Sequence, residues 1–479
     1  MIAVMTVVDP SALGEIAGII GARNVLTGTD AAGWGRDWAG RVTWHPLAVL
    51  RPANTSEVAA IVRLANRHRL PVVPVSGNTN LVKGTEAESA LMLSLDRLSA
   101  IREIRPAARV AVVEAGVIVA AVQEAVAAHD LIFPLKFGAR GSAMIGGVLS
   151  TNAGGSNVLR YGNTRDLCLG LEVVTPTGAV MTLMSALHKD NSGYDLRHLM
   201  IGAEGTLGII TAAVLKLFPR PRATATAMVA VPSIGVALDL LNRLQDQTGG
   251  AVEAFEYMPR SFVAALLARF PEMRPPFEKA YDVNVLVELG SSGARDARPD
   301  AEGRVPLAAH LEEVLGALYD EGLVLDAVVA QNEAQRAEIW ARREASAQIL
   351  RVRSPVVEND IAVATDRMEE LIARIERVSR ALDPGIENTG VAHLGDGNLH
   401  YVGWPSRDDP GLCRAVQRAV EEEVLALGGS FSAEHGVGLS KLPAMAAHKD
   451  PVALEMMRAI KAAVDPNGIM NPGKLIPDQ

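Results

Sequence analysis

The sequence predicts an α+β protein of two domains, and three observations support this fold class. The chain has 479 residues, which is longer than the length over which a single hydrophobic core usually grows. Segments that read as short strands alternate with segments of helical period. Three loops that carry glycine lie between residues 75 and 210. We therefore expect a first domain that binds an extended ligand and a second domain without such loops.

The composition excludes several classes of protein. Hydrophobic residues make up 49% and charged residues 21% of the chain, which is typical of a globular enzyme. The net charge is −9 and there is no basic run, which argues against nucleic acid or an anionic membrane as the main partner. The two cysteines, Cys168 and Cys413, lie far apart, as expected in a reducing cytoplasm. The longest uncharged apolar run, residues 223–238, is too short for a transmembrane segment.

Residues 1–45 form a predicted helical lead-in with an extended part near residues 24–26. A helix follows, for which Thr55 or Ser56 is the expected N-cap. The apolar residues 70–75 then predict a short strand that runs directly into the first glycine-containing loop.

This first loop, Ser76–Asn80, has the residues of a phosphate site. Gly77 allows a tight turn, and successive N–H groups with the Asn78 and Thr79 side chains can surround an anion. The alternative is an ordinary surface turn. The chain contains no GxGxxG motif, so a pyridine-nucleotide Rossmann domain is unsupported.

The second and third loops are much richer in glycine. The second extends over residues 137–156 and the third over residues 201–210. Backbone with so few Cβ atoms can approach a ligand closely. Between them, residues 171–183 predict a strand, a turn and a second strand.

The later part of the chain predicts an antiparallel sheet covered by helices. Residues 227–231, 283–289 and 323–329 read as strands, and residues 236–245 and 306–319 read as helices.

The stretch Val391–Tyr401 predicts a β-hairpin with two histidines. With residues 395–398 as its loop, His393 faces His400 on one face, where two imidazoles can share a metal ion. Further on, Glu434 and His435 add a carboxylate and a third histidine. The alternative for the hairpin is a turn with two ordinary histidines. The alternative for Glu434 and His435 is a pair that caps a helix.

Seven segments in fixed order carry a family resemblance. They are VSGNTN, FGARGSAMIGG, TNAGG, KDNSGYDLRHLMIGAEGTLGIIT, HLGDGNLH, SAEHGVGLSK and DPNGIMNPGK. Together they resemble the FAD-dependent D-2-hydroxyacid dehydrogenases, which have a flavin domain of the vanillyl-alcohol-oxidase or PCMH type. By pattern the chain is most similar to the D-2-hydroxyglutarate dehydrogenases and next to the D-lactate dehydrogenases.

The resemblance implies a domain order and a cofactor site. It implies an FAD-binding domain over residues 46–222, a cap or substrate domain over 223–430, and a C-terminal segment, 431–479, that packs on the flavin domain. The residues expected to bind FAD are Val75, Ser76, Gly77, Asn78, Thr79, Asn80, Leu81, Gly141, Ser142, Gly146, Gly147, Thr151, Asn152, Ala153, Gly154, Gly205, Ile209, Ile210 and Asn471. Residues 75–84 and 134–163 contain no His or Cys, so we expect FAD to be non-covalent.

The resemblance also implies an active site. His393, His400 and Glu434 match the ligands of a divalent metal, for which zinc is expected, and His435 matches the general base. Arg343, in the pattern Trp-x-x-Arg-Glu, matches the clamp for the substrate carboxylate. Hydride then passes from C2 of the substrate to the flavin N5. An electron-transfer flavoprotein or a quinone is the expected acceptor, and a homodimer remains open.

Three positions depart from the hydroxyglutarate enzymes. Where those enzymes carry a hydroxyl residue, a lysine and an asparagine, this chain has Ala347 beside Ser346, then Glu358, then Val402. These changes remove groups that would hold a second carboxylate. We therefore predict a D-2-hydroxy acid with a neutral or apolar side chain, such as D-lactate or a larger acid; the alternative is D-2-hydroxyglutarate. A metal-dependent hydrolase and a non-catalytic flavoprotein remain open as other classes.

Overall fold

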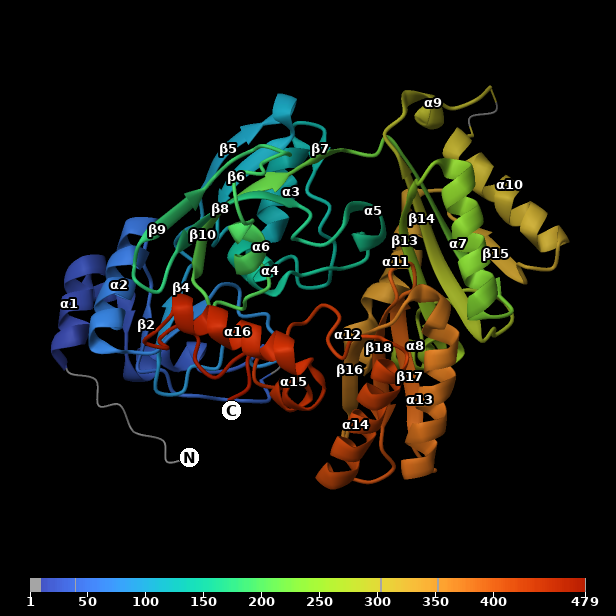
Figure 1. The fold of residues 1–479 in the computed structure, drawn as a ribbon. Coiled ribbons are helices and arrows are strands. Elements are labelled where there is room, and N and C mark those ends of the chain that lie inside the picture. Colours follow the sequence, from blue (N-terminus) through green and yellow to red (C-terminus); the bar gives the residue numbers. More distant parts are fainter. Residues whose placement is uncertain (1–9, 39, 302–303, 351–352, 479) are drawn as a thin grey trace. The chain divides into compact units, whose positions relative to one another are not determined.

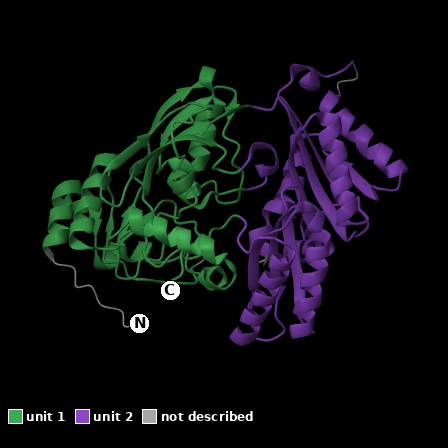
Figure 2. Ribbon diagram, in the orientation of Figure 1, with its two compact units in different colours: residues 1–154, 163–219, 434–479 green, residues 155–162, 220–433 purple. Residues whose placement is uncertain are grey.

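The computed structural model describes residues 10–38, 40–301, 304–350 and 353–478, and Figure 1 shows the fold. The chain divides into two compact units, which Figure 2 distinguishes by colour. Unit 1 comprises residues 1–154, 163–219 and 434–479, and unit 2 comprises residues 155–162 and 220–433. Residues 1–9 of the predicted lead-in lie outside the described residues. Among those described, no helix has both the length and the apolar character needed to cross a membrane.

Unit 1 contains two larger sheets and a small one. In the order in which they pair, the strands of the first sheet are β1 (Val25–Leu26), β2 (Ala48–Leu50), β4 (Leu91–Ser94) and β3 (Val72–Val75). Those of the second, antiparallel sheet are β5 (Ile101–Arg105), β6 (Val110–Glu114), β10 (Ile209–Lys216), β8 (Cys168–Val174) and β9 (Val180–Leu183). The third sheet pairs β11 (Phe218–Pro219) with β7 (Leu131–Ile132). Strands β2, β4 and β3 are parallel, so their carboxyl ends share one edge, where the first glycine-containing loop begins.

Unit 1 also contains α-helices and short 3-10 helices. They are α1 (Pro10–Ile20), η1 (Ala22–Asn24), η2 (Gly28–Trp34), α2 (Thr55–His68), η3 (Pro106–Ala108), α3 (Val119–Ala127), α4 (Ile145–Thr151), α6 (Leu196–Met200), α15 (Leu442–His448) and α16 (Pro451–Val464). Of these, α2 buries an apolar face. The N-cap of α2 is Asn54, whose side chain accepts from the Glu57 amide at 2.9 Å, so the expected Thr55 or Ser56 cap was wrong. Glu57 in turn accepts from the Ala53 amide, and this exchange fixes the helix start one residue earlier.

Unit 2 is built on one seven-stranded antiparallel sheet. In spatial order its strands are β15 (Asp326–Val329), β12 (Ala223–Val231), β14 (Val283–Ser291), β13 (Val252–Pro259), β17 (Glu387–His393), β18 (Asn398–Trp404) and β16 (Val357–Ala362). Its helices are α5 (Val158–Tyr161), α7 (Ile234–Thr248), α8 (Arg260–Arg269), α9 (Ala294–Ala297), α10 (Pro306–Asp320), α11 (Glu333–Glu344), α12 (Ser346–Leu350), η4 (Thr365–Arg367), α13 (Met368–Leu382) and α14 (Pro410–Ala426).

The two faces of this sheet differ in chemistry. Apolar side chains of one face pack with α7, α10, α13 and α14 in a large continuous core. The other face packs with α8, α11 and α12 in a smaller apolar cluster, and the same face carries Glu256, Glu288, His393 and His400. Because side chains alternate along a strand, all these polar residues fall on one side.

Residues 155–162 were expected in the flavin domain, but they belong to unit 2. The Arg160 guanidinium donates to the Glu253 carboxylate at 2.8 Å, and the Tyr161 hydroxyl donates to the same carboxylate at 2.6 Å. Burial and the Glu253 charge raise the pKa of Tyr161, so this hydroxyl stays a donor. These hydrogen bonds anchor the short segment to the sheet of unit 2.

The two-histidine hairpin forms, but in a different register. His393 pairs with Asn398 and Val391 pairs with His400, instead of His393 with His400. The His393 carbonyl accepts from the amides of Asp396 and Gly397, which closes the turn one residue earlier than predicted. Each partner shifts by two residues, so both histidines stay on the same face.

Candidate active site

The loop after β3 starts the cofactor region of unit 1. Asn78 has a φ of 49°, and its side chain accepts from the Thr85 hydroxyl and donates to the Arg36 carbonyl. Asn80 accepts from the amides of Val82 and Gly84. Both asparagine side chains thus hold the loop in shape.

The segments expected to bind FAD meet around this loop. A Cβ on Gly77 would overlap the carbonyl oxygen of Ser142, and a Cβ on Gly146 would lie 3.1 Å from the Ser76 hydroxyl. A Cβ on Gly205 would likewise meet the ring of Pro74, at the end of β3. Such close backbone packing explains why these positions are glycine. The structure therefore places parts of three separate loops at one edge of the parallel strands.

Asn471 joins the same region from the C-terminal segment. Its amide donates to the Val72 carbonyl at 2.8 Å, and its side-chain nitrogen donates to the carbonyls of Gly84 and Glu204. Its side-chain oxygen is buried and has no hydrogen-bond partner within the described part of the chain. A buried oxygen of this kind requires a donor, and a bound cofactor can supply one. This group fits the expected FAD site.

Three other predicted cofactor residues are held by the fold of unit 1. Asn152 ends α4 with a φ of 51° and accepts from the Arg165 amide at 2.9 Å. Ile209 and Ile210 are buried at the start of β10. They shape the region without offering polar groups of their own.

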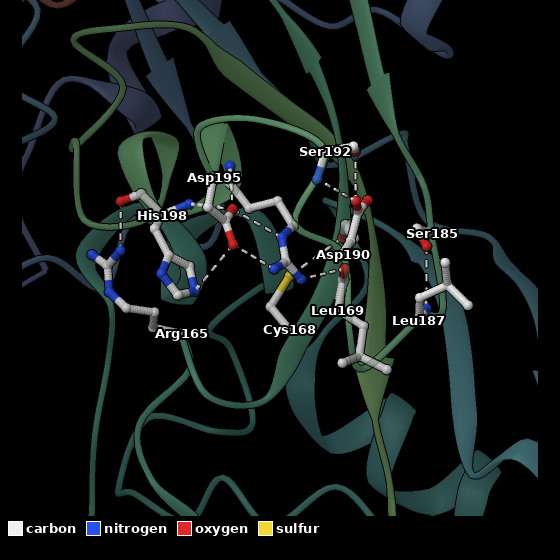
Figure 3. Close-up of polar contacts among 11 residues, drawn as sticks. Arg165, Cys168, Leu169, Ser185, Leu187, Asp190, Ser192, Asp195 and His198 are labelled. Atoms are coloured by element: carbon white, nitrogen blue, oxygen red, sulfur yellow. Dashed lines mark hydrogen bonds and ion pairs between the residues drawn. The ribbon is translucent and has the colours of Figure 1, made fainter.

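A polar cluster holds the helix before the third loop (Figure 3). The Asp195 carboxylate caps α6 by accepting from the Arg197 and His198 amides, and it pairs with the Arg197 guanidinium. That pair holds the pKa of Asp195 at about 2. Arg165 donates to the carbonyls of His198 and Ile201. The cluster thereby fixes the position from which residues 202–208 begin.

Substituting Gly77 tests the cofactor region directly. In Gly77→Ala the added methyl meets backbone of the second loop, which cannot move aside like a side chain. We expect the purified variant to retain less than about a tenth of the wild-type FAD, because one loop must shift. The ratio of flavin to protein absorbance measures this. Gly138→Ala is the control, since a Cβ there meets nothing within 4 Å; equal FAD loss in both variants would contradict the explanation.

Glu204 fixes the segment that carries Glu434 and His435. Its carboxylate accepts from the amides of Val437 and Gly438 at 2.7 and 2.8 Å. Burial raises the pKa of Glu204 although these bonds oppose the shift. Within this segment the His435 Nε2 atom lies 3.5 Å from the Glu434 carboxylate. The two residues are thus held as a pair, and neither caps a helix.

The two histidines of the predicted metal site lie together in unit 2. The rings of His393 and His400 are edge to face, with centroids 5.3 Å apart. His393 Nδ1 lies 2.7 Å from Glu256, and His400 Nδ1 lies 3.8 Å from Asp360. Carboxylates beside Nδ1 leave the Nε2 atoms as the natural ligand atoms. The donor set therefore fits a divalent metal.

Arg343 lies on α11 and points to the same sheet face. Its Nε atom is 2.7 Å from a Glu256 oxygen, and its Nη1 atom donates to Ser346 at 3.3 Å. The residue is only 7% exposed, and its Nη2 atom has no hydrogen-bond partner among the described residues. An unpaired buried guanidinium nitrogen fits a substrate carboxylate.

Two anchors hold α11 in place. Asn332 caps it by accepting from the Gln335 amide. The buried Glu288 accepts from the Arg336 guanidinium and from the Trp340 indole, the latter at 2.6 Å. Trp340 in the recognised pattern thus has a structural role, which is to fix the helix that carries Arg343.

The other predicted pocket residues differ in their surroundings. Val402 is buried in the apolar cluster and pairs with Glu358 across the strands, on the face of His400. Ala347 is exposed on α12. Arg342, the neighbour of Arg343, donates to Glu338 and to the Arg274 carbonyl.

Glu256 is the residue that the sequence analysis missed. It is fully buried in β13, between His393 and Arg343. Burial alone would raise the pKa of Glu256, but the charges of these two partners outweigh it and lower the pKa to about 2. A glutamate inside the apolar run of residues 252–259 was the available signal, since a buried carboxylate needs cationic partners.

Glu434 and His435 begin the last part of unit 1, directly after Ala433. The Ala433 amide donates to the Asp360 carbonyl at 3.2 Å in unit 2. The residue of unit 2 that directly precedes this pair is therefore hydrogen-bonded to β16.

Known families match both units. Residues 46–184 match the FAD binding domain family, and residues 220–475 match the C-terminal domain of FAD linked oxidases. Among solved structures, p-cresol methylhydroxylase has a TM-score of 0.76 at 17% identity, covering 98% of this chain and 96% of that one. The 4-ethylphenol oxidase of Gulosibacter chungangensis has a TM-score of 0.72 at 20% identity, covering 98% and 97%. These likenesses confirm the predicted PCMH-type flavin fold with a cap domain.

Curated relatives are more similar in sequence. The D-2-hydroxyglutarate dehydrogenase of Xanthomonas citri pv. viticola is 35% identical over 98% of this chain and 97% of its own. That of Stutzerimonas stutzeri is 34% identical over 98% and 99%. The mitochondrial enzyme of Bos taurus is 36% identical over 92% of this chain and 79% of its own. With both units matched and the relatives aligned over nearly the whole length, the chain belongs to the FAD-dependent D-2-hydroxyacid dehydrogenases, in the family of the D-2-hydroxyglutarate dehydrogenases.

Proposed function

We propose that the chain oxidises D-2-hydroxyglutarate to the 2-oxo acid. The observation that carries the reaction class is Arg343, a buried arginine with an unpaired Nη2 atom on the sheet face of a two-histidine pair. The choice of substrate rests on the names of the relatives, which favour the dicarboxylate over the neutral acid predicted from the sequence.

Each residue has a proposed role. The Arg343 fork binds the substrate carboxylate next to the reacting carbon. His393, His400 and Glu434 hold a divalent metal, with zinc as our choice, and Asp360 lies beside His400. Histidine nitrogen and carboxylate oxygen are both ligand atoms that zinc accepts. His435 accepts the hydroxyl proton of the substrate.

The cofactor site lies in unit 1. The loops at residues 75–81, 141–154 and 205–210, with Asn471, hold FAD without a covalent bond. FAD, when bound, accepts hydride from C2 of the substrate at its N5 atom. The residues of the chain orient the hydroxy acid and take its proton. An electron-transfer flavoprotein or a quinone then reoxidises the enzyme, and we place the protein in the cytoplasm, which suits its two free cysteines.

A second candidate is a D-2-hydroxy acid with an apolar side chain, such as D-lactate or a larger acid. Val402 is buried among apolar side chains, and the Glu358 carboxylate lies opposite it on the same face. These two residues offer no cation to a second substrate carboxylate, and an unpaired buried carboxylate is costly.

A substrate panel decides between the two candidates. D-2-hydroxyglutarate, D-lactate and D-2-hydroxybutyrate are added anaerobically to the purified yellow protein, and flavin bleaching is recorded. We expect D-2-hydroxyglutarate to bleach the flavin with the highest kcat/KM, while faster bleaching by the neutral acids would establish the second candidate. A colourless protein would indicate a hydrolase, and a flavin that stays oxidised with every acid would indicate a non-catalytic flavoprotein.

A further inference from the structure

One carboxylate touches both functional side chains of unit 2. Glu256 Oε1 lies 2.7 Å from His393 Nδ1, and Glu256 Oε2 lies 2.7 Å from Arg343 Nε. The side chain is fully buried, so water does not compete for it. We propose that Glu256 is a positioning residue that fixes the metal-binding histidine and the substrate-binding arginine in one geometry. This inference rests on the function proposed above.

Toward His393, the carboxylate selects a tautomer. An ionised carboxylate only accepts hydrogen bonds, so His393 Nδ1 must carry a proton. The Nε2 atom then presents its lone pair, which is the form that binds a metal. The ring is also held against rotation, because its Nδ1 atom is fixed at 2.7 Å.

Toward Arg343, the carboxylate fixes the plane of the guanidinium. With Nε at Glu256 and Nη1 at Ser346, the planar group has two of its three nitrogens held. The third, Nη2, has no partner among the described residues, so it is the nitrogen left for a ligand. Glu256 thereby determines in which direction the substrate carboxylate is bound.

A second buried glutamate provides a matched comparison. Glu288, on the neighbouring strand β14, also pairs with an arginine of α11, here Arg336, through two hydrogen bonds. It further accepts from Trp340 and Thr226. Through Arg336 and Trp340, Glu288 holds α11 to the sheet.

The test compares Glu256→Gln with Glu288→Gln in the FAD-loaded protein. Glutamine is neutral and has one acceptor oxygen, so it can accept from His393 but cannot also form the ion pair with Arg343. We expect Glu256→Gln to weaken the binding of Zn²⁺ about 10–100-fold, the usual effect of losing a carboxylate behind a metal-bound histidine. Competition between the protein and a fluorescent chelator for zinc sulfate measures this affinity without substrate.

The control separates positioning from folding. Glu288→Gln removes an equally buried charge, so we expect a lower Tm with Zn²⁺ affinity within about twofold of wild type. Equal weakening by both variants would reduce Glu256 to a structural residue, and unchanged Zn²⁺ affinity in Glu256→Gln would overturn the proposal.

A measurement on the wild-type protein covers the case in which Glu256→Gln does not fold. Protein labelled with 15N-histidine, with His393→Gln used to assign the signal, should show His393 protonated at Nδ1 before metal is added. Protonation at Nε2 would overturn the proposal. The zinc and NMR measurements need no substrate, so they stand apart from the substrate panel, which alone decides the proposed function.

Discussion

Replacing His435 with glutamine is expected to lower kcat about 10²–10⁴-fold, the range that a positioned general base contributes. His435 lies beside Glu434 in a segment held by Glu204, so its ring has a fixed place in unit 1. Glutamine keeps polarity and approximate size but cannot take up a proton at neutral pH. The rate of dye reduction with D-2-hydroxyglutarate measures kcat, and flavin absorbance checks that FAD remains bound.

The pH profile distinguishes a base from a structural histidine. If His435 takes the proton, the wild-type kcat falls at low pH, where the base is protonated, and the variant loses this dependence. His198→Gln is the matched control, because that histidine lies in the same unit beside Asp195 and has no proposed role in the reaction. A variant of His435 with unchanged kcat would assign the base to another group.

Local patterns predicted most elements and both regions of the site. The apolar runs around residues 227–231 and 283–289 became β12 and β14 because β-branched and other apolar residues fit a buried sheet. The glycines at positions 77, 146 and 205 predicted backbone that approaches a ligand closely, and in the structure a Cβ at each of them would also meet backbone or a side chain of the protein itself. These features depend on neighbours in sequence, so the sequence displays them.

Features that depend on contacts between residues far apart in the sequence could not be predicted in this way. Glu256 lies 137 positions before His393, and its importance follows only from the pairing of β13 with β17. The hairpin register depended on which amides close the turn at His393, and on Asn398, whose side chain donates to Asp360 on β16. Residues 155–162 belong to unit 2 because Arg160 and Tyr161 donate to one carboxylate, that of Glu253 in β13.

Replacing Arg343 with lysine is expected to lower kcat/KM about 10²-fold, mainly through a higher KM. Lysine keeps the charge that Glu256 requires, so the buried carboxylate stays paired and the Tm changes little. It loses the planar fork, and with it the Nη2 atom that is free to bind the substrate. The expected loss, about 2.7 kcal/mol, corresponds to one or two charge-assisted hydrogen bonds. Steady-state kinetics with D-2-hydroxyglutarate measures it.

Arg342→Lys is the matched control, because Arg342 neighbours Arg343 in α11 and is similarly buried, at 6% exposure. Its guanidinium is engaged by Glu338 and the Arg274 carbonyl, away from the histidines. We expect this variant to lose some stability and to keep its KM. A raised KM in both variants would mean that α11 has moved as a whole, whereas a raised KM in Arg343→Lys alone assigns substrate binding to the one arginine that Glu256 holds.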